Sequence, residues 1–538
     1  MTPTQLLLAL LLIPFCSGLI AFAMRWLGSG SRQLATLIHL VSISLVLVFS
    51  VLVINRVLAD GALTALGHWF HIDSLGAIFL ALVGGVGFLT GLYSIGYMNH
   101  EVRNGEIDVK TLCNYYGFFS LFISTMVLVV IANNVILMWV AVEATTIGSA
   151  FLVGLYGQRT SLEASWKYII ICSVGVAFGL YGTVLIFSNA SNLPMLSDPE
   201  LATSWMHLVQ HAQLLDPTLT TIAFVFILIG FGTKAGLFPM HTWLPDAYAE
   251  APSPVSALLS SALSNCAFLI IIRYFIIASK TLGPGMPQNL LLAFGIMSIA
   301  CAALFIIVQR DIKRLLAYSS VENIGIVALA FGIGGPLGII AGLLHALNNS
   351  IAKALAFCGS GNILLKYGTR DMKAVKGVMN VMPASAVFFG IGVLALGGLP
   401  PFNVFVSEFL VVSAGIKAGN AWLTIIIMLL LAMVFAGIVR MVTGSLLGDA
   451  PENVQKGELS LIKLVPMAIF VVIMLWMGIR MPQPVVTLLE NATKIVLNKG
   501  DAPLDVSVQT PWQMLSANTS QNVAPKPASE VATTTASH

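Results

Sequence analysis

The chain has 538 residues, of which 57% are hydrophobic and 9% charged, and its mean hydropathy is +0.92. A soluble domain carries about 25% charged residues, so this composition excludes a soluble globular enzyme and indicates an all-α, polytopic membrane protein. The formal net charge of +3, with no basic stripe or arginine-rich arm, excludes a nucleic-acid-binding protein.

Fourteen apolar stretches are long enough to cross about 30 Å of hydrocarbon. The first 24 residues contain neither Lys nor Arg, so the basic region of a cleavable signal peptide is missing, and we expect the first stretch to be retained. The stretch 408–445 is longer than one crossing needs, and we expect it to combine a crossing with a re-entrant or tilted entry. The predicted spans are 4–24, 34–55, 73–98, 113–132, 134–156, 164–188, 218–240, 252–278, 289–309, 312–334, 336–364, 382–406, 408–445 and 461–479.

The distribution of Lys and Arg predicts the orientation in the membrane. Fifteen of these residues lie in or beside the odd-numbered connections, whereas four lie in the even-numbered ones. The positive-inside rule therefore places the odd connections in the cytoplasm and both termini on the periplasmic side. The long connection 189–217 contains acidic residues and His but neither Lys nor Arg, which agrees with a periplasmic position.

Two further features concern the ends and the cysteines. Residues 500–538 are polar and poor in bulky apolar side chains, so they cannot bury enough surface to fold, and we expect a disordered tail. The six cysteines are widely scattered and form no CxxC motif, which argues against an iron–sulfur cluster or a zinc site within this chain.

Lys234 lies within the apolar run TTIAFVFILIGFGTKAGLFP, just before the proline-broken segment PMHTWLP at 239–245. A charged side chain at the centre of a bilayer costs about 2.5–3.5 kcal/mol, so such residues are usually functional. Broken helices are tolerated at this depth where they face protein or a watery cavity. Five other ionisable residues also interrupt predicted spans, namely Glu143, Lys167, His345, Lys353 and Glu408.

Two interpretations of this set remain open. Polar side chains can pair across a helix bundle and simply hold it together. Alternatively, a lysine whose carboxylate partner approaches or withdraws has a switchable proton affinity, as a proton relay requires. Costly residues spread over five helices exceed what packing requires, which favours the relay.

Similar spacings suggest two related halves. The proline break before residue 245 is echoed by GGLPPFNVF at 397–405, and paired interrupted helices are typical of repeated transporter halves. Three pairs of ionisable residues have nearly equal separations: Glu143 and Glu322 by 179, Lys167 and His345 by 178, and Lys234 and Glu408 by 174 residues.

The run GTKAGLFPMHTWLPDAYAEAPSPVSALLS resembles a signature of the antiporter-like subunits of respiratory complex I, of cation/proton antiporter complexes and of membrane-bound nickel–iron hydrogenases. The runs QRDIKRLLAYSSVENIG and GLPPFNVFVSEF resemble further motifs of that family, and the resemblance covers roughly residues 70–445. Within the family, HEVRNGEIDVKTLCNYYGFF and WVAVEATTIGSAF are most similar to the component F subfamily of hydrogenase-4, from formate hydrogenlyase-type complexes.

The resemblance implies two inverted five-helix repeats, with breaks in helices 7 and 12 and half-channels that meet on a central polar axis. The implied organisation is 1–112 for helices 1–3, 113–278 for the first repeat (helices 4–8), 279–445 for the second repeat (helices 9–13), 446–499 for the last transmembrane helix and 500–538 for the tail.

The resemblance also implies roles for the site residues. Glu143 matches the family's glutamate on helix 5, which modulates the lysine of helix 7, here Lys234. Lys167 matches the lysine of helix 6, His345 and Lys353 match polar positions of helix 11, and Glu408 matches an acidic residue that some members have on helix 12.

Helix 8 departs from the family pattern. Several members have Lys or His there, whereas this chain reads LLSSALSNCAFLIII and offers Ser260 and Asn265. Because Asn does not take up a proton near neutral pH, we expect an interrupted link between the two halves.

The function implied by the resemblance is proton translocation by a membrane-arm subunit of a hydrogenase-4 or formate hydrogenlyase-type complex in the bacterial inner membrane. The nickel–iron site and iron–sulfur clusters would lie in partner membrane and hydrogenase subunits, with no cofactor or metal in this chain. Two alternatives stay open: a subunit of an NADH–quinone oxidoreductase or sodium/proton antiporter, and a structural membrane subunit with little or no pumping.

Overall fold

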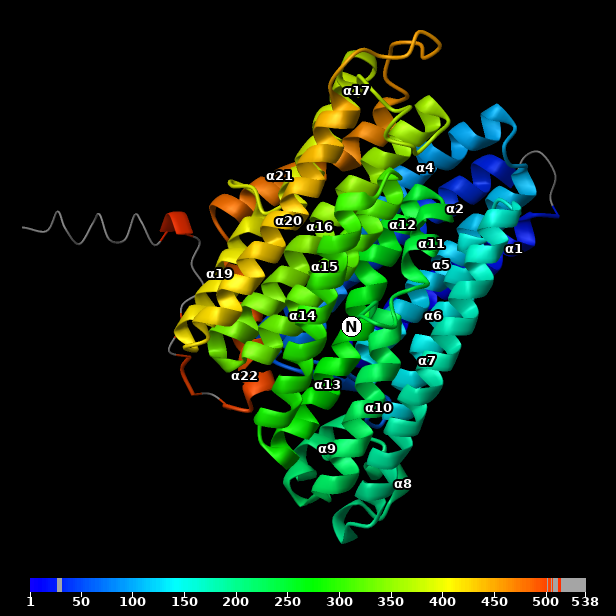
Figure 1. Ribbon diagram of the computed structural model, residues 1–538. Helices are drawn as coiled ribbons and strands as arrows, with labels where there is room; N and C mark the ends of the chain where they lie inside the picture. The colour runs from blue at the N-terminus through cyan, green and yellow to red at the C-terminus, as the bar shows by residue number, and fades with distance from the viewer. Residues whose placement is uncertain (27–30, 501, 505, 507–510, 514–538) are drawn as a thin grey trace, which may run out of the picture.

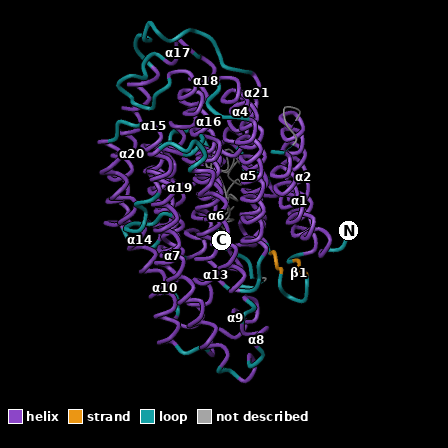
Figure 2. The backbone as a smooth tube through the Cα atoms, turned by 90° about the vertical axis from the view of Figure 1, so that its right-hand side faces the viewer, coloured by secondary structure: helices purple, strands orange, loops and turns teal. Residues whose placement is uncertain are grey.

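A computed structural model describes residues 1–26, 31–500, 502–504, 506 and 511–513. Long helices run side by side between two ends of the molecule, with α17 (Val378–Val381) at one end and α8 (Pro199–Ala202) and α9 (Trp205–His211) at the other (Figures 1 and 2). Most of the predicted disordered tail, 500–538, falls outside the described residues.

The apolar stretches form helices because lipid offers no hydrogen bonds, so each backbone polar group must be satisfied within the segment. Within the described part of the chain, thirteen helices are long and apolar enough to cross a membrane. They are α1 (Pro3–Met24), α2 (Ser31–Asp60), α3 with α4 (Ser74–Ala81 and Gly87–Asn104), α5 (Val109–Ile131), α6 (Val135–Val153), α7 (Arg159–Ser191), α10 (Pro217–Ala235), α12 with α13 (Ser253–Leu258 and Ser264–Leu282), α14 (Gly285–Val308), α15 (Ile312–Ile333), α16 (Gly335–Tyr367), α20 (Ala421–Leu446) and α21 (Leu461–Ile479).

The twelfth predicted span, 382–406, is broken: α18 (Pro383–Leu396) ends before the prolines, and α19 (Asn403–Lys417) follows them. The predicted boundary near residue 407 is wrong, because 408–417 belongs to α19 and the next crossing, α20, begins at Ala421. The other predicted break is confirmed: α10 ends before Gly236, whose φ of +93° suits glycine, and the chain turns before α11 (Leu244–Glu250).

Several shorter elements lie outside the spans. Strands β1 (Leu63–Ala65) and β2 (Phe70–Ile72) form an antiparallel hairpin that the sequence analysis did not predict. Helices α8 and α9 lie in the connection 189–217. Helix α22 (Gln483–Leu497) follows α21 and buries Leu489 and Ala492.

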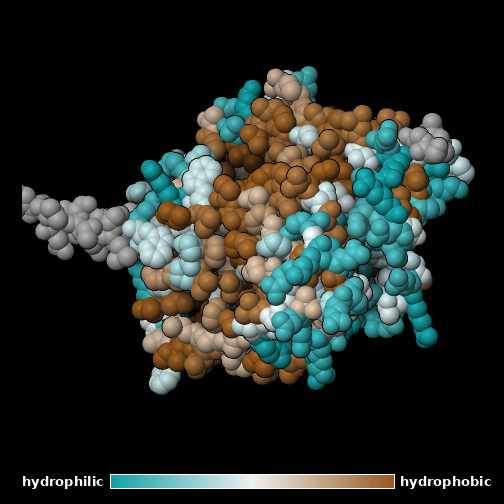
Figure 3. Space-filling model, turned by 90° about the horizontal axis from the view of Figure 1, so that it is seen from above, coloured by the Kyte–Doolittle hydropathy of each residue, from teal (hydrophilic) through white to brown (hydrophobic). Residues whose placement is uncertain are grey.

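The core lies around α13 and α16, whose most apolar stretches are completely buried, whereas α1, α2, α7 and α20 expose apolar side chains at the periphery. Small residues permit the closest contacts. A Cβ at Gly230 of α10 would lie 2.2 Å from the backbone nitrogen of Gly179 in α7. Figure 3 looks onto the end that carries α17, and it shows a broad hydrophilic area beside apolar surface.

Candidate functional site

Lys234 is completely buried in the last turn of α10, where helix carbonyls and the helix dipole favour a cation. Its Nζ donates hydrogen bonds to Thr146 Oγ1 of α6 (2.8 Å) and to the Tyr168 hydroxyl of α7 (2.6 Å). The same nitrogen lies 4.6 Å from the centroid of the Tyr168 ring. Neutral hydroxyls and an aromatic face on two neighbouring helices thus hold the ammonium group.

Glu143 lies on α6 one turn before Thr146, so both side chains face the same side of that helix. Its Oε1 accepts a hydrogen bond from Ser173 Oγ of α7 at 2.6 Å. Among the described residues, Lys234 forms no ion pair with a carboxylate within 4.0 Å, and Glu143 Oε2 is buried without a hydrogen-bond partner. Lys234 and Glu143 therefore lie on two helices that the Lys234–Thr146 hydrogen bond joins, but their charged groups do not form an ion pair.

Lys167 does not join this buried group, although it lies within the predicted span 164–188. Its side chain is 47% exposed and forms ion pairs with Glu163 (2.7 Å) and with Asp246 of α11 (3.3 Å). The reason is that α7 is 33 residues long, and the turn that carries Lys167 lies in its first third. Its role in a proton path stays a prediction.

The second half contains another fully buried lysine, Lys353 of α16. Its Nζ donates to Ser319 Oγ (2.6 Å) and to the Leu316 carbonyl (3.0 Å), both on α15. Glu322 lies on the same helix, one turn after Ser319, and is also buried. The two halves thus share a pattern: a buried lysine bonded to a hydroxyl, with a glutamate one turn away on the helix that bears the hydroxyl.

His345 extends this group from α16 toward α19. One ring nitrogen is hydrogen-bonded with Asn323 Oδ1 (3.0 Å) and the other with Ser407 Oγ (3.0 Å). Asn323 in turn donates to Glu322 Oε2 at 2.8 Å. The predicted site residues His345 and Lys353 are therefore joined to Glu322 through α15.

Glu408 follows Ser407 on α19. A Cβ at Gly398 would lie 2.1 Å from Glu408 Oε2, so the carboxylate packs against the glycine in the break between α18 and α19. Gly398 has a φ of +71°, where glycine is favoured. Each broken span thus places an ionisable side chain beside its break, Lys234 in one and Glu408 in the other.

Asn265 of α13 belongs to the predicted first repeat and is buried. Its Nδ2 donates to the Ser261 carbonyl (2.6 Å) and to Ser350 Oγ of α16 (2.8 Å). Ser350 is one turn from Lys353 on α16. The amide joins the halves structurally, although it contains no group that titrates near neutral pH.

Aromatic side chains fill the space between Lys234 and α13. The Tyr168 and Trp243 ring centroids are 4.6 Å apart, and those of Trp243 and Tyr248 are 5.9 Å apart. The Tyr248 hydroxyl donates to the Leu259 carbonyl (3.0 Å) and shares a hydrogen bond with Ser264 Oγ (3.0 Å). The tyrosine hydroxyls give this region polar groups that the sequence analysis missed.

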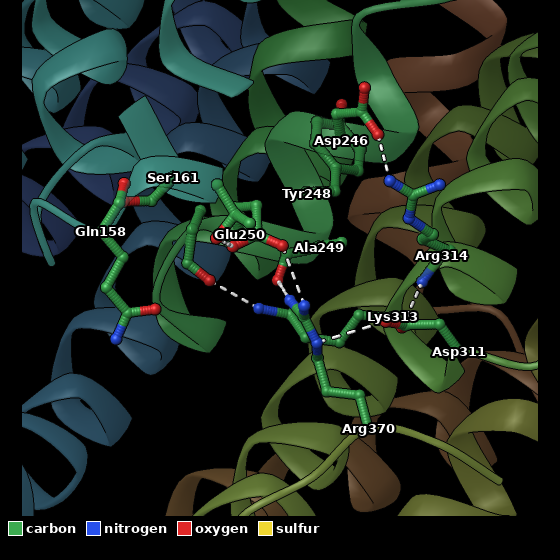
Figure 4. Close-up of polar contacts among 12 residues, drawn as sticks. Gln158, Ser161, Asp246, Tyr248, Ala249, Glu250, Asp311, Lys313, Arg314 and Arg370 are labelled. Atoms are coloured by element: carbon green, nitrogen blue, oxygen red, sulfur yellow. Dashed lines mark hydrogen bonds and ion pairs between the residues drawn. The ribbon is translucent and has the colours of Figure 1, made fainter. Parts of the chain in front are cut away.

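A charged cluster joins α11, α15 and the loop after α16 at the predicted cytoplasmic end (Figure 4). Arg370 forms ion pairs with Glu250 (2.8 Å) and Asp311 (3.2 Å), and Arg314 pairs with Asp246. Burial opposes ionisation of Glu250, but the hydrogen bond and charge of Arg370 lower its pKa below the ordinary value. Glu250 and Arg370 also line a cavity of about 430 Å³.

Glu322 is buried beside the predicted site residues of α16, but it was not among the six residues predicted from the sequence. It was visible as a carboxylate in an apolar span and as the counterpart of Glu143 by spacing. The hydroxyl partners Thr146, Tyr168 and Ser319 had no comparable signal, because Ser, Thr and Tyr are common in membrane helices.

A family model described as "NADH:quinone oxidoreductase/Mrp antiporter, TM" matches residues 132–435, which include all six predicted site residues. The chain belongs to this family. A second model, for the N-terminus of complex I chain 5, matches 65–105 of this antiporter-like chain. The resemblance seen in the sequence motifs is confirmed.

Proteins with similar sequences include subunits of hydrogenase-4 and of a Na⁺/H⁺ antiporter. A hydrogenase-4 component F homolog of Methylacidiphilum infernorum is 42% identical over 65% of this chain and 73% of its own length. Hydrogenase-4 component B of Escherichia coli is 31% identical over 63% of this chain, and a Na⁺/H⁺ antiporter subunit A1 of Staphylococcus aureus is 31% identical over the same share. These matches span 50% and 41% of the two longer relatives.

Solved structures show the same antiporter-like fold. A chain of an archaeal membrane-bound sulfane sulfur reductase superposes with a TM-score of 0.81 at 23% identity, covering 92% of this chain and 98% of that one. A chain of the Mrp complex from Dietzia superposes with a TM-score of 0.79 at 19% identity, covering 93% and 98%. Among the described residues, no group of three or more His, Cys, Asp or Glu is arranged to hold a metal ion.

Proposed function

We propose that this chain is the membrane-arm subunit of a hydrogenase-4 or formate hydrogenlyase-type complex, and that it translocates protons when partner subunits carry out redox chemistry. The relatives named as hydrogenase-4 components support the type of complex. The nickel–iron site and iron–sulfur clusters belong to the partner subunits in this proposal.

One observation carries the proposal: Lys234 and Lys353 are completely buried, yet neither forms an ion pair with a carboxylate within 4.0 Å among the described residues. An unpaired charge buried inside a bundle is costly, and neutral polar side chains are sufficient to hold membrane helices together. Hydroxyl acceptors leave each lysine free to gain or lose a proton. Buried lysines without charge partners are therefore better explained as relay groups than as packing contacts.

The geometry gives each lysine a nearby regulator. Glu143 is bonded to Ser173 and lies one turn from Thr146, which accepts a hydrogen bond from Lys234. A charge on this carboxylate favours the protonated lysine, and its withdrawal or neutralisation disfavours it. A redox-driven change in a partner subunit that reaches Glu143 would therefore change the proton occupancy of Lys234.

The proposed path begins at a half-exposed residue and continues through buried ones. Lys167 forms an ion pair with Asp246, which belongs to the charged cluster of Figure 4, and it marks the proposed cytoplasmic entry. Beyond the centre, Lys353 and His345 lead through Ser407 toward Glu408 at the break of the last broken span. This arrangement supports two groups of buried polar side chains, one around Lys234 and one around Lys353, with Asn265 between them in the proposed path.

A structural subunit with little or no pumping is a second candidate, and Asn265 favours it. Its Nδ2 group donates two hydrogen bonds, to Ser261 and Ser350, and the amide neither gains nor loses a proton near neutral pH. A role in an antiporter or a quinone-reducing complex is a third candidate, supported by the relative named as a Na⁺/H⁺ antiporter subunit.

We also propose a bacterial inner-membrane location with both termini in the periplasm. Lys and Arg gather in the connections at the α17 end, including Arg370, Lys373, Lys376 and Lys456. The connection 189–217, which contains α8 and α9, has neither. This asymmetry supports a cytoplasmic α17 end.

The test is proton uptake by inverted vesicles that contain the assembled complex, measured together with hydrogen evolution. We expect Lys234→Ala and Glu143→Gln to abolish or strongly reduce uptake, whereas Lys417→Ala, at the exposed end of α19, has no effect. Unchanged uptake and turnover in both variants of an assembled complex would show that the relay is wrong. Hydrogen evolution without any uptake in the wild type would favour the structural subunit.

A further inference from the structure

An apolar groove of about 470 Å³ lies between α6 and α7. Its rim carries exposed apolar side chains: Ile147 (59%) and Phe151 (56%) from α6, and Trp166 (63%) from α7. Both helices are membrane spans, so this rim faces the bilayer or a neighbouring protein. The groove thus presents a continuous apolar surface on the outside of these two helices.

The floor of the groove belongs to the candidate proton path. Thr146, which accepts a hydrogen bond from Lys234, lines the groove, and so does Ser173, which donates to Glu143. Through these two hydrogen bonds the lining of the groove contacts Lys234 and the half-buried Glu143 directly.

One stripe of α7 continues from this floor to the predicted cytoplasmic surface. Arg159, Leu162, Trp166, Ile169 and Ser173 follow spacings of three and four residues, so they share one face of the helix. All except Arg159 line the groove, and Arg159 is exposed at the first turn. The carboxylate of Glu163 also influences Arg159 but forms its ion pair with Lys167.

The length of this stripe matches one leaflet. At about 1.5 Å per residue, Ser173 lies roughly 21 Å along the helix from Arg159. Half of a bilayer, with its headgroup region, is about 20–22 Å thick. A phosphate at the level of Arg159 would therefore place the end of its acyl chain near Thr146 and Ser173.

We propose that this groove binds one acyl chain of an anionic phospholipid, whose phosphate is held at Arg159. The chain seals the lipid side of Glu143 and Lys234, and this consequence rests on the proposed function. The binding itself does not depend on proton translocation, because it requires only the apolar groove and the basic residue at its cytoplasmic end.

The experiment uses the assembled complex in nanodiscs that contain a photoreactive acyl chain, on either phosphatidylglycerol or phosphatidylcholine, with crosslinks mapped by mass spectrometry. We expect crosslinks at Ile147, Phe151 and Trp166, about fivefold more with phosphatidylglycerol, since one basic residue contributes about that factor near an anionic lipid. Arg159→Gln should remove this preference. Ile147→Trp should reduce groove crosslinks at least fivefold, whereas Val174→Trp, at an exposed position elsewhere on α7, should leave them unchanged.

Equal yields from the two lipids, or groove crosslinks that persist in Ile147→Trp, would overturn the proposal. Crosslinks that join the groove to a neighbouring subunit would overturn it too, because protein would then fill the site. Loss of proton uptake in Lys234→Ala with unchanged lipid crosslinks concerns the proposed function alone.

Discussion

Replacing Tyr168 by Phe isolates one contact of Lys234. The Tyr168 hydroxyl accepts a hydrogen bond from Lys234 Nζ at 2.6 Å and shares another with Ser149 Oγ at 2.7 Å. Phenylalanine keeps the ring that lies 4.6 Å from the ammonium nitrogen and the contact with Trp243. The substitution therefore removes a hydrogen-bond acceptor while preserving the shape of the core.

The size of the effect follows from the charge of the donor. A hydrogen bond to a charged group contributes about 1.5–3 kcal/mol, so the protonated form of Lys234 loses this amount relative to the neutral form. That corresponds to roughly a 10- to 150-fold change in the ratio of the two forms. Because Thr146 still accepts a hydrogen bond, we expect proton uptake to fall severalfold without being abolished.

The assay is the ratio of protons taken up to hydrogen evolved in inverted vesicles, with the amount of assembled complex measured in parallel. Tyr274→Phe is the matched control, because Tyr274 is equally buried and its hydroxyl donates to the neutral Thr183 Oγ1 at 2.9 Å. Wild-type uptake in Tyr168→Phe would refute the reasoning. An equal loss in Tyr274→Phe would also refute it, since a general effect of losing a buried hydroxyl would then explain the result.

Three further predictions concern stability and packing. Glu250→Gln should destabilise the protein by about 1–3 kcal/mol at pH 7 through loss of the charged contact with Arg370. The pKa of Glu250 is lowered in the folded protein, so this stabilisation is complete above the ordinary pKa of 4.5 and is lost as the pH falls through the lower folded pKa. The melting temperatures of wild type and variant should therefore converge in acid. A difference in melting temperature that stays constant with pH would contradict this prediction. Asn265→Ala removes two buried hydrogen bonds and should cost roughly 2 kcal/mol in denaturant unfolding in detergent, whereas no change would show that the bridge contributes nothing. Gly230→Ala should reduce the amount of folded protein, because the new Cβ would meet the backbone of α7. Gly444→Ala is the control, because a Cβ there meets nothing within 4 Å. Equal yields of the two variants by size-exclusion chromatography would count against close packing of α10 on α7.

Much of the fold was predictable because lipid leaves the backbone few choices. Length and apolarity were sufficient to locate the spans, and the prolines at 239 and 400 located the two breaks. The hairpin at 63–72 could not be found in this way, because its strands have only three residues each. Short strands are fixed by their neighbours and not by a pattern of their own.

Burial of individual side chains was less predictable than the spans. Lys167 and Lys234 both lie in apolar runs, but one is half-exposed and the other is completely buried. A hydropathy window cannot tell which turn of a long helix reaches the surface. Glu163, four residues before Lys167, was the available signal, since an i,i+4 ion pair is typical of a solvated helix face.

The contact between α13 and α16 is the step of the proposed path that lacks a titratable side chain. Asn265 bridges α13 and α16, but an amide cannot carry a proton from Lys234 toward Lys353. The neighbouring groups that can both donate and accept are hydroxyls, including Tyr248 at the α13 side and Ser350 on α16. If protons cross between the halves, they must therefore pass along hydroxyls and water beside Asn265, with the amide holding the helices in register. In that case, the lack of a Lys or His at the position of Asn265 changes the groups that carry the proton, from a basic side chain to hydroxyls and water.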